Sequence, residues 1–322
     1  MKKIIDGIYQ IEVVLPEVGG LNLYFLEGDI PTLVDTGPVL PGIRKQIDLC
    51  LRQVGRQLGD LQRIIITHGH VDHYGLAEQL QEISGAEIIM SAPERQLLLD
   101  FQLGGEKDRL ADGLTTWGVP VKLSQGILNY FDLLTSLGCH TKDIRTVADG
   151  VSLKAGQWNW QVHCCAGHSP AGLCFSNADG LIFSGDHILA NISPNPGVDL
   201  TRERPFQGGL QEYIDSLKEM SHLPVKLCLP GHGPLVRDFQ ERIRNLLLEI
   251  AARRTRILAL VGEQPKSIFR LGEELLATLG RKLTVSQLWL ALKEVKSHLD
   301  LLEQEIQVQM VEIEGVNCYR LV

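Results

Sequence analysis

The stretch that decides the fold runs Ile64-Ile65-Ile66-Thr67-His68-Gly69-His70-Val71-Asp72-His73. Its three isoleucines are β-branched and apolar, so they predict a buried strand. Three histidines and an aspartate follow that strand within six positions. Open α/β sheets place their chemistry at the carboxyl ends of strands, and imidazole and carboxylate are both metal ligands. Four such side chains on one tight turn can face two neighbouring points, which predicts a site for two metal ions.

Three further strand-end loops carry side chains of the same kinds. His168 stands in Ala166-Gly167-His168-Ser169-Pro170-Ala171-Gly172, and His232 stands in Leu229-Pro230-Gly231-His232-Gly233-Pro234. Asp186 follows the apolar stretch Leu181-Ile182-Phe183, within Ser184-Gly185-Asp186-His187. Glycine at position 185 would let the backbone come close to a metal ion, and a carboxylate at position 186 can bridge two cations. A recurrence of this kind argues against a polar turn with coincidental histidines.

The order of these motifs resembles that of the metallo-β-lactamase superfamily. The motifs are His-x-His-x-Asp-His, Gly-His-Ser-Pro-Ala-Gly, Ser-Gly-Asp and Pro-Gly-His-Gly, preceded by Leu33-Val34-Asp35-Thr36-Gly37. They cover roughly residues 8 to 235. The resemblance implies an α/β fold, namely an αββα sandwich with helices outside two sheets.

Carried over residue by residue, the resemblance implies two metal ions with a hydroxide between them. It assigns three ligands to the first metal, three to the second and one bridging ligand: His68, His70 and His168; Asp72, His73 and His232; and Asp186. Asp72 is also the catalytic proton acceptor that orients the hydroxide. Asp35 supports the ligand loop from outside, and Tyr74 and His187 are candidates for contacts to ligands or substrate. Zn²⁺ is the default at both sites, with Fe and Mn as alternatives.

Composition and charge restrict the class of protein. The chain has 322 residues, 44% of them apolar, which is enough for two folding units. The net charge of −8 argues against a general attraction to nucleic acid or to an anionic membrane. Asp6 and Glu12 interrupt any signal-peptide core, and no apolar run approaches about 18 residues. Seven scattered cysteines indicate free thiols, so we expect a cytoplasmic protein without a membrane span.

The pattern of strands and helices predicts two similar halves around an insertion. Strands are expected at residues 8–14, 21–26, 31–35, 61–66 and 86–90, then near 145–153 and at 158–165, 172–176, 181–184 and 225–229. Helices are expected at residues 41–54, from about 75, and at 209–221. Residues from about 94 to 143 fit neither half, and their leucines and aromatic side chains predict two or three inserted helices. These helices either cap the metal cleft and shape an apolar pocket, or serve packing or a homodimer contact.

The C-terminal part predicts a second, smaller unit. A long linker helix is expected at residues 238–262, followed by helices near 267–279 and 284–304 and a hairpin from Ile306 to Leu321. This order resembles a winged helix, which a lactamase-β-like subgroup of the superfamily carries as a tail. We therefore divide the chain into a catalytic domain of residues 1–237 and a linker helix plus winged-helix-like domain of residues 238–322. From Thr255 onward there are eight basic and nine acidic residues, which favours packing, dimerisation or cleft shaping over nucleic-acid binding.

The metals point to hydrolysis of a small-molecule substrate. A metal ion lowers the pKa of bound water to about 7, so no serine or cysteine nucleophile is needed. An ester, thioester or lactone is the favoured bond, although glutathione-binding basic residues of the glyoxalase II kind are not evident. The alternatives are a two-metal phosphodiesterase or ribonuclease, a mononuclear-iron persulfide dioxygenase that does not need the His232 site, and a metal-dependent DNA-binding regulator. β-Lactam hydrolysis is disfavoured, because two-zinc enzymes of that kind commonly have cysteine at the position of Asp186.

Overall fold

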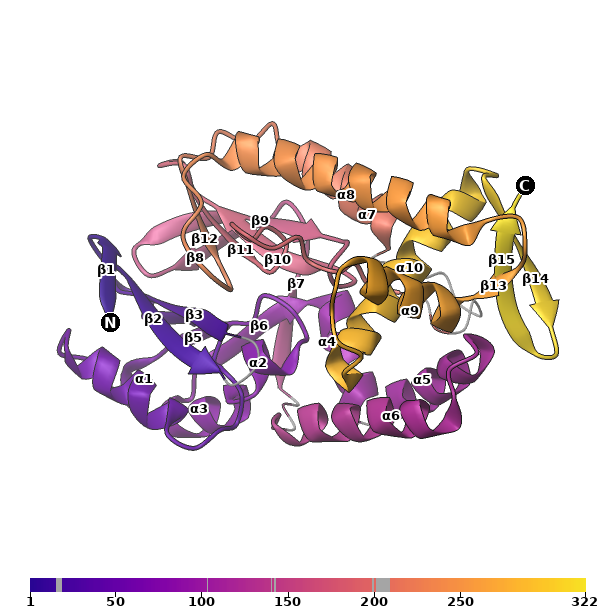
Figure 1. The fold of residues 1–322 in the computed structure, drawn as a ribbon. Coiled ribbons are helices and arrows are strands. Elements are labelled where there is room, and N and C mark those ends of the chain that lie inside the picture. The colour runs from indigo at the N-terminus through magenta and orange to yellow at the C-terminus, as the bar shows by residue number, and fades with distance from the viewer. Residues whose placement is uncertain (16–18, 103, 140, 142, 199, 201–208) are drawn as a thin grey trace.

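The computed structural model describes residues 1–15, 19–102, 104–139, 141, 143–198, 200 and 209–322. Two β-sheets lie face to face and helices cover their outer faces (Figure 1). The predicted αββα sandwich is therefore confirmed. No helix in the described ranges is long and apolar enough to cross a membrane.

The first sheet has seven strands in sequence order. They are β1 (Lys2–Ile5), β2 (Ile8–Leu15), β3 (Gly19–Leu26), β4 (Thr32–Val34), β5 (Arg63–Ile65), β6 (Glu87–Ser91) and β7 (Ile144–Val147). Strands β4 to β7 run parallel to one another, so their carboxyl ends meet at one edge. The helices α1 (Ile43–Arg52) and α3 (Ala77–Ser84) connect strands of this sheet and bury their apolar faces against it.

The second sheet has five strands in the order β12-β11-β10-β9-β8. They are β8 (Ser152–Ala155), β9 (Trp158–Cys165), β10 (Gly172–Ser176), β11 (Leu181–Gly185) and β12 (Leu227–Pro230). The helices α7 (Leu210–Met220) and α8 (Phe239–Val261) bury apolar side chains against its outer face. Strands β11 and β12 are parallel, which again places two carboxyl ends side by side.

Alternation along each strand explains the layers. On β10, Leu173 and Phe175 point into the core between the sheets, whereas Cys174 points to the outer core under α7 and α8. The central core is closed by aromatic side chains from both sheets, including Tyr24 and Phe183 with ring centroids 5.1 Å apart. Both faces of the second sheet are thus buried at its centre, which is why β10 and β11 are almost continuous apolar runs. At the edge of this sheet, β8 alternates between buried and exposed residues.

One predicted element differs from the structure. The stretch near residues 145–153 forms two strands, β7 and β8, which belong to different sheets. Asp149 and Gly150 form a turn between them, and Gly150 has a left-handed φ of 75° that glycine adopts without a steric penalty. The chain therefore passes from one sheet to the other within the stretch that the sequence indicated as one strand region.

The inserted segment is helical, as predicted. It contains α4 (Ala92–Gln102), α5 (Gly105–Thr116) and α6 (Val121–Ser136). Leu110 and Trp117 share a buried core with side chains of the C-terminal helices, among them Ile257 and Leu288. The insertion and the C-terminal part therefore pack on each other beside the sandwich (Figure 1).

The C-terminal part consists of α8, then α9 (Ile268–Thr278) and α10 (Val285–Gln304), and a three-stranded sheet. That sheet has the order β13-β15-β14, with β13 (Lys266–Ser267), β14 (Val308–Ile313) and β15 (Val316–Leu321). Asp238, Ser267 and Thr284 begin the three helices, and each side chain accepts a hydrogen bond from a backbone N–H three residues on. The predicted helices and hairpin are present, while the winged-helix arrangement itself stays a prediction.

Candidate metal centre

The assigned ligands lie at the carboxyl ends of strands from both sheets. His68 and His70 follow β5, and Asp72 and His73 lie on the short helix α2 (Val71–Tyr74). His168 lies in the loop between β9 and β10, Asp186 directly follows β11, and His232 lies two residues after the end of β12. The two sheets thus bring together residues that are more than a hundred positions apart in the sequence.

Hydrogen bonds between the sheets hold these loops in place. The backbone N–H of Asn22 on β3 donates to the carbonyl of Gly231 (2.7 Å), and its side-chain amide donates to the carbonyl of Pro230 (3.0 Å). The N–H of Leu173 on β10 donates to the carbonyl of Thr67 (2.6 Å). The ligand loops of one sheet are therefore fixed against the other sheet rather than left free.

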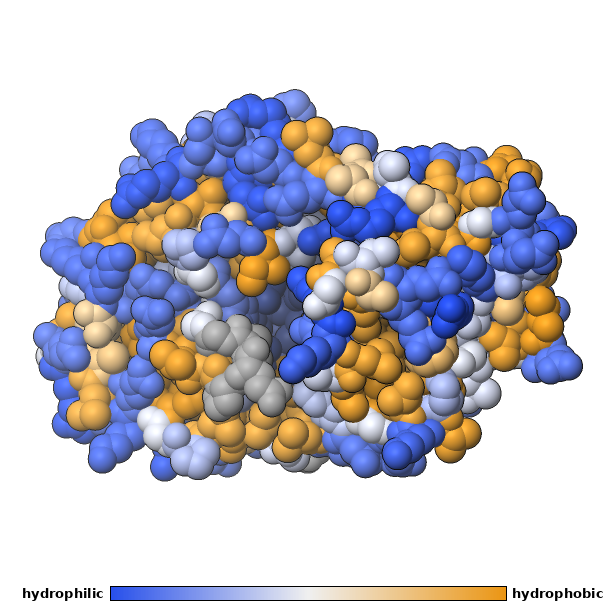
Figure 2. Space-filling model, in the orientation of Figure 1, coloured by the Kyte–Doolittle hydropathy of each residue, from blue (hydrophilic) through white to orange (hydrophobic). Residues whose placement is uncertain are grey.

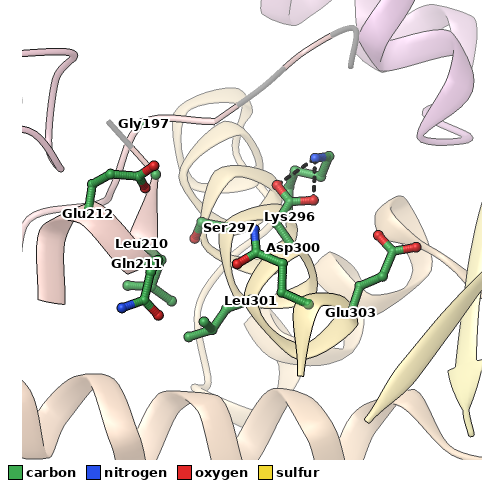
Figure 3. A pocket seen from close by; sticks show the side chains of 11 residues that line it. Gly197, Leu210, Gln211, Glu212, Lys296, Ser297, Asp300, Leu301 and Glu303 are labelled. Atoms are coloured by element: carbon green, nitrogen blue, oxygen red, sulfur yellow. Dashed lines mark hydrogen bonds and ion pairs between the residues drawn. The ribbon is translucent and has the colours of Figure 1, made fainter. Parts of the chain in front are cut away.

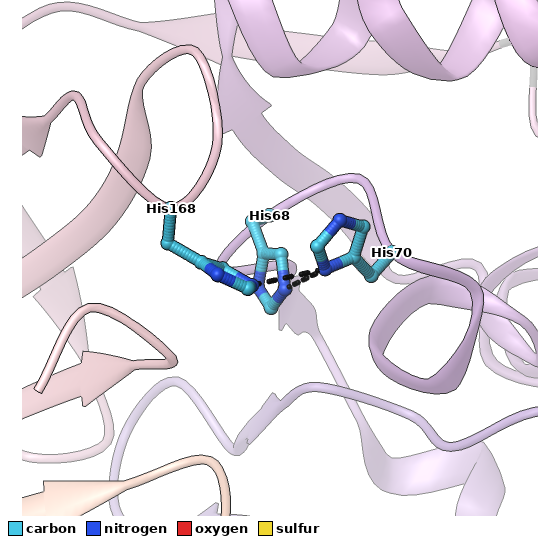
Figure 4. A group of neighbouring side chains, drawn as sticks. All are labelled: His68, His70 and His168. Carbon is cyan, nitrogen blue, oxygen red and sulfur yellow. Dashed lines mark hydrogen bonds between the residues drawn. The ribbon is translucent and has the colours of Figure 1, made fainter. Parts of the chain in front are cut away.

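Three histidines form the first group of ligand atoms (Figure 4). His68 Nε2 lies 2.9 Å from His70 Nδ1, and His168 Nε2 lies 3.1 Å from the same atom. Nitrogens bound to one tetrahedral Zn²⁺ are separated by about 3.3 Å, given Zn–N distances of about 2.0–2.1 Å. The three rings therefore converge as ligands of one ion would.

Asp72, His73 and His232 form the second group. His232 Nε2 lies 3.2 Å from Asp72 Oδ2, and His73 Nε2 lies 3.7 Å from the same oxygen. Asp186 stands between the groups, because its Oδ2 lies 3.9 Å from His168 Nε2 and 3.5 Å from His232 Nε2. This is the position that a bridging carboxylate needs.

In three of the candidate ligand histidines, the ring nitrogen that faces away from the centre is held by a hydrogen bond. His73 Nδ1 donates to Asp35 (2.8 Å), His168 Nδ1 to the carbonyl of Asn195 (2.9 Å), and His232 Nδ1 to the carbonyl of Gly20 (3.0 Å). Such partners fix the tautomer and leave Nε2 as the free lone pair. Asp35 also accepts from the backbone N–H and hydroxyl of Thr67 (2.8 and 2.9 Å).

The electrostatics of the centre also suit cations. Burial lowers the pKa of His68 and His70 well below the usual value and that of His168 to about 4, which leaves these rings neutral. Burial alone would raise the pKa of Asp72, but the charge of His73 and the hydrogen bond with His232 outweigh it and lower the pKa to about 2. Neutral imidazole and ionised carboxylate are the forms that bind metals.

Two buried atoms of the centre have no hydrogen-bond partner among the described residues: His73 Nε2 and Asp186 Oδ1, which lie 3.6 Å apart. Burial would lower the pKa of His73, yet the carboxylates of Asp186, Asp35 and Asp72 raise it well above the usual value. These three carboxylates therefore concentrate negative charge at a site where a cation would balance it. The residues present fit divalent metal ions.

Close approach at this centre requires glycine at two positions. A Cβ on Gly231 would lie 2.4 Å from Asp186 Oδ1 and 2.8 Å from the His73 ring. A Cβ on Gly185 would lie 2.8 Å from the Thr67 side chain. Gly185, for which we expected an approach to metal, thus allows β11 to pack against the residue that precedes the first ligand.

Glu94 is a residue of the centre that the sequence analysis did not identify. It is fully buried on α4, and its carboxylate accepts from the backbone N–H groups of Gly69 and Ala171 at 2.8 Å each. Gly69 lies between the first two ligands, and Ala171 lies three residues after His168. One carboxylate therefore ties two ligand loops together, and burial raises its pKa.

The remaining assigned residues lie at different distances from the centre. Tyr74 borders the cleft but is almost fully buried in the core under α1 and α3. His187 is not brought to the cleft, because it points to the opposite side of the chain from Asp186. Its Nε2 shares a hydrogen bond with Ser216 (2.8 Å), and its ring packs edge-on against Tyr213.

The centre opens into a cleft of about 880 Å³. His70, Asp72, His168, Asp186 and His232 line its floor, and most of the remaining lining is apolar. The walls come from α4 and α6 of the insertion and from α9 and α10 of the C-terminal part. Figure 2 shows a hollow near the centre of this face.

The chain belongs to the metallo-beta-lactamase superfamily, whose family model matches residues 17–232. The predicted resemblance is confirmed, and the protein is a hydrolase of that superfamily with residue groups that can hold metal. The matched range contains all seven assigned ligands and the insertion.

Relatives and solved structures agree with this membership. The chain is 26% identical over 310 residues to the probable metallo-hydrolase YqjP of Bacillus subtilis, with 93% of each chain covered. It is 27% identical to the atrochrysone carboxyl ACP thioesterase of Aspergillus fumigatus, covering 52% of this chain and 38% of that protein. A beta-lactamase domain protein from Burkholderia ambifaria superposes with a TM-score of 0.86 at 26% identity, covering 99% of this chain and 94% of that one. The family protein TTHA1429 of Thermus thermophilus shares the fold with a TM-score of 0.78.

Proposed function

We propose that the protein hydrolyses an ester, thioester or lactone of a small molecule with two divalent metal ions, zinc by default. The observation that carries the proposal is the pair of ligand groups on either side of Asp186 at the floor of a large, mainly apolar cleft. His68, His70 and His168 would hold one ion, and Asp72, His73 and His232 would hold the other. The fungal relative named as a thioesterase supports an acyl substrate.

Different residues of the chain have different roles in the proposed reaction. Bound metal ions supply Lewis acidity, which acidifies a water molecule and polarises a carbonyl group. Asp72 lines the cleft and is ionised at neutral pH, so it can accept the proton of the attacking water. The apolar walls hold the acyl group and exclude bulk water. Asp35 and Glu94 keep the ligand loops in position.

The proposal includes the organisation of the chain and its surroundings. Residues 1–237 form the catalytic domain, and residues 238–322 form the linker helix and tail that complete the cleft. All seven cysteines are free thiols in the structure, in keeping with a cytoplasmic protein. A small molecule is the only partner that the proposed reaction requires.

The test combines metal analysis with a substrate panel. Protein purified without added metal should contain two Zn or Mn ions per chain and should hydrolyse esters or thioesters in a chelator-sensitive manner. Asp186→Ala should lose metal and turnover together, while Asp179→Ala, on an exposed turn, should keep both. One Fe per chain with oxygen uptake on a persulfide, or turnover of phosphodiesters alone, would refute the proposal.

A further inference from the structure

One face of α10 forms part of the wall of the cleft. Trp289, Leu290 and Lys293 all line the cleft. Lys293 lies four residues after Trp289 and three after Leu290, so it shares a side of the helix with both. The Lys293 ammonium lies 6.0 Å from the centre of the Trp289 ring. Glu294 of the same helix also lines the cleft but pairs with Arg253 (3.5 Å), so Lys293 is the charge on this face that has no ion pair with a described residue.

Lys293 has no anionic partner among the residues that the structure describes. Lys296, one turn further along α10, contrasts with it, because its ammonium lies 2.6 Å from both carboxylate oxygens of Asp300 (Figure 3). Burial, with no compensating carboxylate, lowers the pKa of Lys293 to about 8. A desolvated ammonium without a partner is unfavourable, so its position calls for an anion that the described residues do not supply.

Lys293 is also close to the metal centre. The side-chain amide of Asn195 donates to the carbonyl of Leu290 on α10 (2.9 Å), and the carbonyl of Asn195 accepts from His168. The same cleft is lined by His70, His168 and Lys293. Burial is the main cause of the low pKa of His70 and His168, and the positive charge of Lys293 lowers both further.

Apart from the metal centre and two carboxylates that are each paired with an arginine, the cleft divides into an apolar and a cationic part. Phe101 of α4 and Phe131 of α6 stack with ring centroids 5.0 Å apart on the insertion side. On the C-terminal side, Arg256 and Arg281 also line the cleft, and neither forms an ion pair with a described residue. An occupant that satisfies both parts is amphipathic, with a hydrocarbon group and an anionic group.

We propose that the substrate is an acyl ester or thioester that also carries a carboxylate or phosphate group, and that Lys293 binds this group while the hydrocarbon part packs on Phe101 and Phe131. The inference rests on the proposed hydrolysis and names its substrate class. Lys293 donates up to three hydrogen bonds, and a charge-assisted bond in a partly buried cleft is strong enough to select an anionic substrate over its neutral analogue.

Matched thioesters test the inference. The neutral reference is the octanoyl thioester of N-acetylcysteamine. Three anionic analogues are the octanoyl thioesters of 3-mercaptopropionate and 4′-phosphopantetheine and the half-thioester of octanedioic acid with N-acetylcysteamine. These place a carboxylate or a phosphate on the thiol side, or a carboxylate at the far end of the acyl chain. The preferred analogue identifies the kind and place of the anionic group.

Lys293→Met should lower kcat/KM for the preferred anionic thioester on the order of 10- to 100-fold, mainly through KM, and leave the neutral thioester unchanged. Lys293→Arg keeps the charge and should retain most of the preference. Lys282→Met removes an exposed lysine outside the cleft and is the matched control. An equal loss on neutral and anionic thioesters, or no loss on any analogue, would overturn the inference.

A binding measurement separates this inference from the proposed hydrolysis. Non-hydrolysable S-octyl thioethers of N-acetylcysteamine, 3-mercaptopropionate and 4′-phosphopantetheine, and the S-(7-carboxyheptyl) thioether of N-acetylcysteamine, are titrated calorimetrically into the metal-loaded protein. Tighter binding of an anionic thioether that disappears in Lys293→Met supports the inference even if no thioester is hydrolysed. Equal affinities of wild type and Lys293→Met for all four thioethers contradict it even if thioesters are hydrolysed.

Discussion

Replacing Lys293 by methionine should stabilise the folded protein while it removes the preference for an anionic substrate. The pKa of Lys293 falls from 10.5 to about 8 on burial, and each pKa unit corresponds to about 1.4 kcal/mol. The buried ammonium therefore lowers the free energy of unfolding by about 3 kcal/mol at pH 7. Methionine has a similar length and no charge, so it removes this penalty and keeps the apolar contacts of the stem.

The direction in which stability changes with pH follows from the lowered pKa of Lys293. Because the pKa is lower in the folded than in the unfolded state, the unfolded chain binds more protons between about pH 8 and 10.5. Stability of the wild-type protein therefore rises with pH in that window, and the advantage of Lys293→Met falls to about 2 kcal/mol at pH 9. Below pH 8 the penalty is fully present.

Urea unfolding at pH 7 and pH 9 measures the stability difference between Lys293→Met and wild type and its change with pH. The difference between Lys293→Met and wild type should be positive at pH 7 and smaller at pH 9, while Lys282→Met should stay within about 0.5 kcal/mol of wild type at both. A destabilised Lys293→Met protein, or a difference that grows with pH, would show that Lys293 already has an anionic partner within the chain.

Two further predictions concern the support of the metal centre. Glu94→Gln should weaken metal affinity about 10- to 100-fold, because an amide, unlike an ionised carboxylate, has only one oxygen to accept from the N–H groups of Gly69 and Ala171. Competition with a chromophoric chelator measures the metal affinity. Glu82→Gln, on the exposed face of α3, is the control and should bind metal like wild type. Gly231→Ala should reduce the metal content per chain, because the added Cβ would lie 2.4 Å from Asp186 Oδ1. Elemental analysis measures this content, and it should be full in the control Gly59→Ala, where the atom nearest to the added Cβ is 4.0 Å away. A fully loaded Gly231→Ala protein would contradict the close approach.

The fold and the ligand set could be predicted because they leave local signals. The isoleucine run of β5, the glycines beside His168 and His232, and the carboxylate after β11 each mark a strand end that carries a polar side chain. Their order in the chain was sufficient for the resemblance, and the family membership confirms it. What the order could not give is the geometry itself, such as the distances of 3.9 and 3.5 Å from Asp186 Oδ2 to His168 Nε2 and His232 Nε2.

Residues that support the centre leave weaker signals. The sequence Ser91-Ala92-Pro93-Glu94 fits a capping box, and Ser91 Oγ does accept from the backbone N–H of Glu94 (3.4 Å). The glutamate carboxylate, however, binds two loops that come from other parts of the chain. A local pattern can predict the helix start but not this use of the side chain. His187 shows the reverse case, since adjacency to Asp186 suggested a role, but in the turn after β11 its side chain contacts Ser216 and Tyr213 of α7 instead of the cleft.

In the proposed reaction, catalysis and substrate choice depend on different segments of the chain. Every assigned metal ligand lies between residues 68 and 232, whereas α10 and the loop that precedes it supply Trp289, Lys293 and Arg281 to the wall of the cleft. A change on α10 can therefore alter which acyl compound binds without touching a ligand, provided that the link from Leu290 through Asn195 to His168 is kept. Because this link joins the backbone of α10 to a ligand ring, the position of Lys293 relative to the metals is fixed by the fold. Side-chain replacement at position 293 thus probes recognition of the substrate separately from assembly of the metal centre.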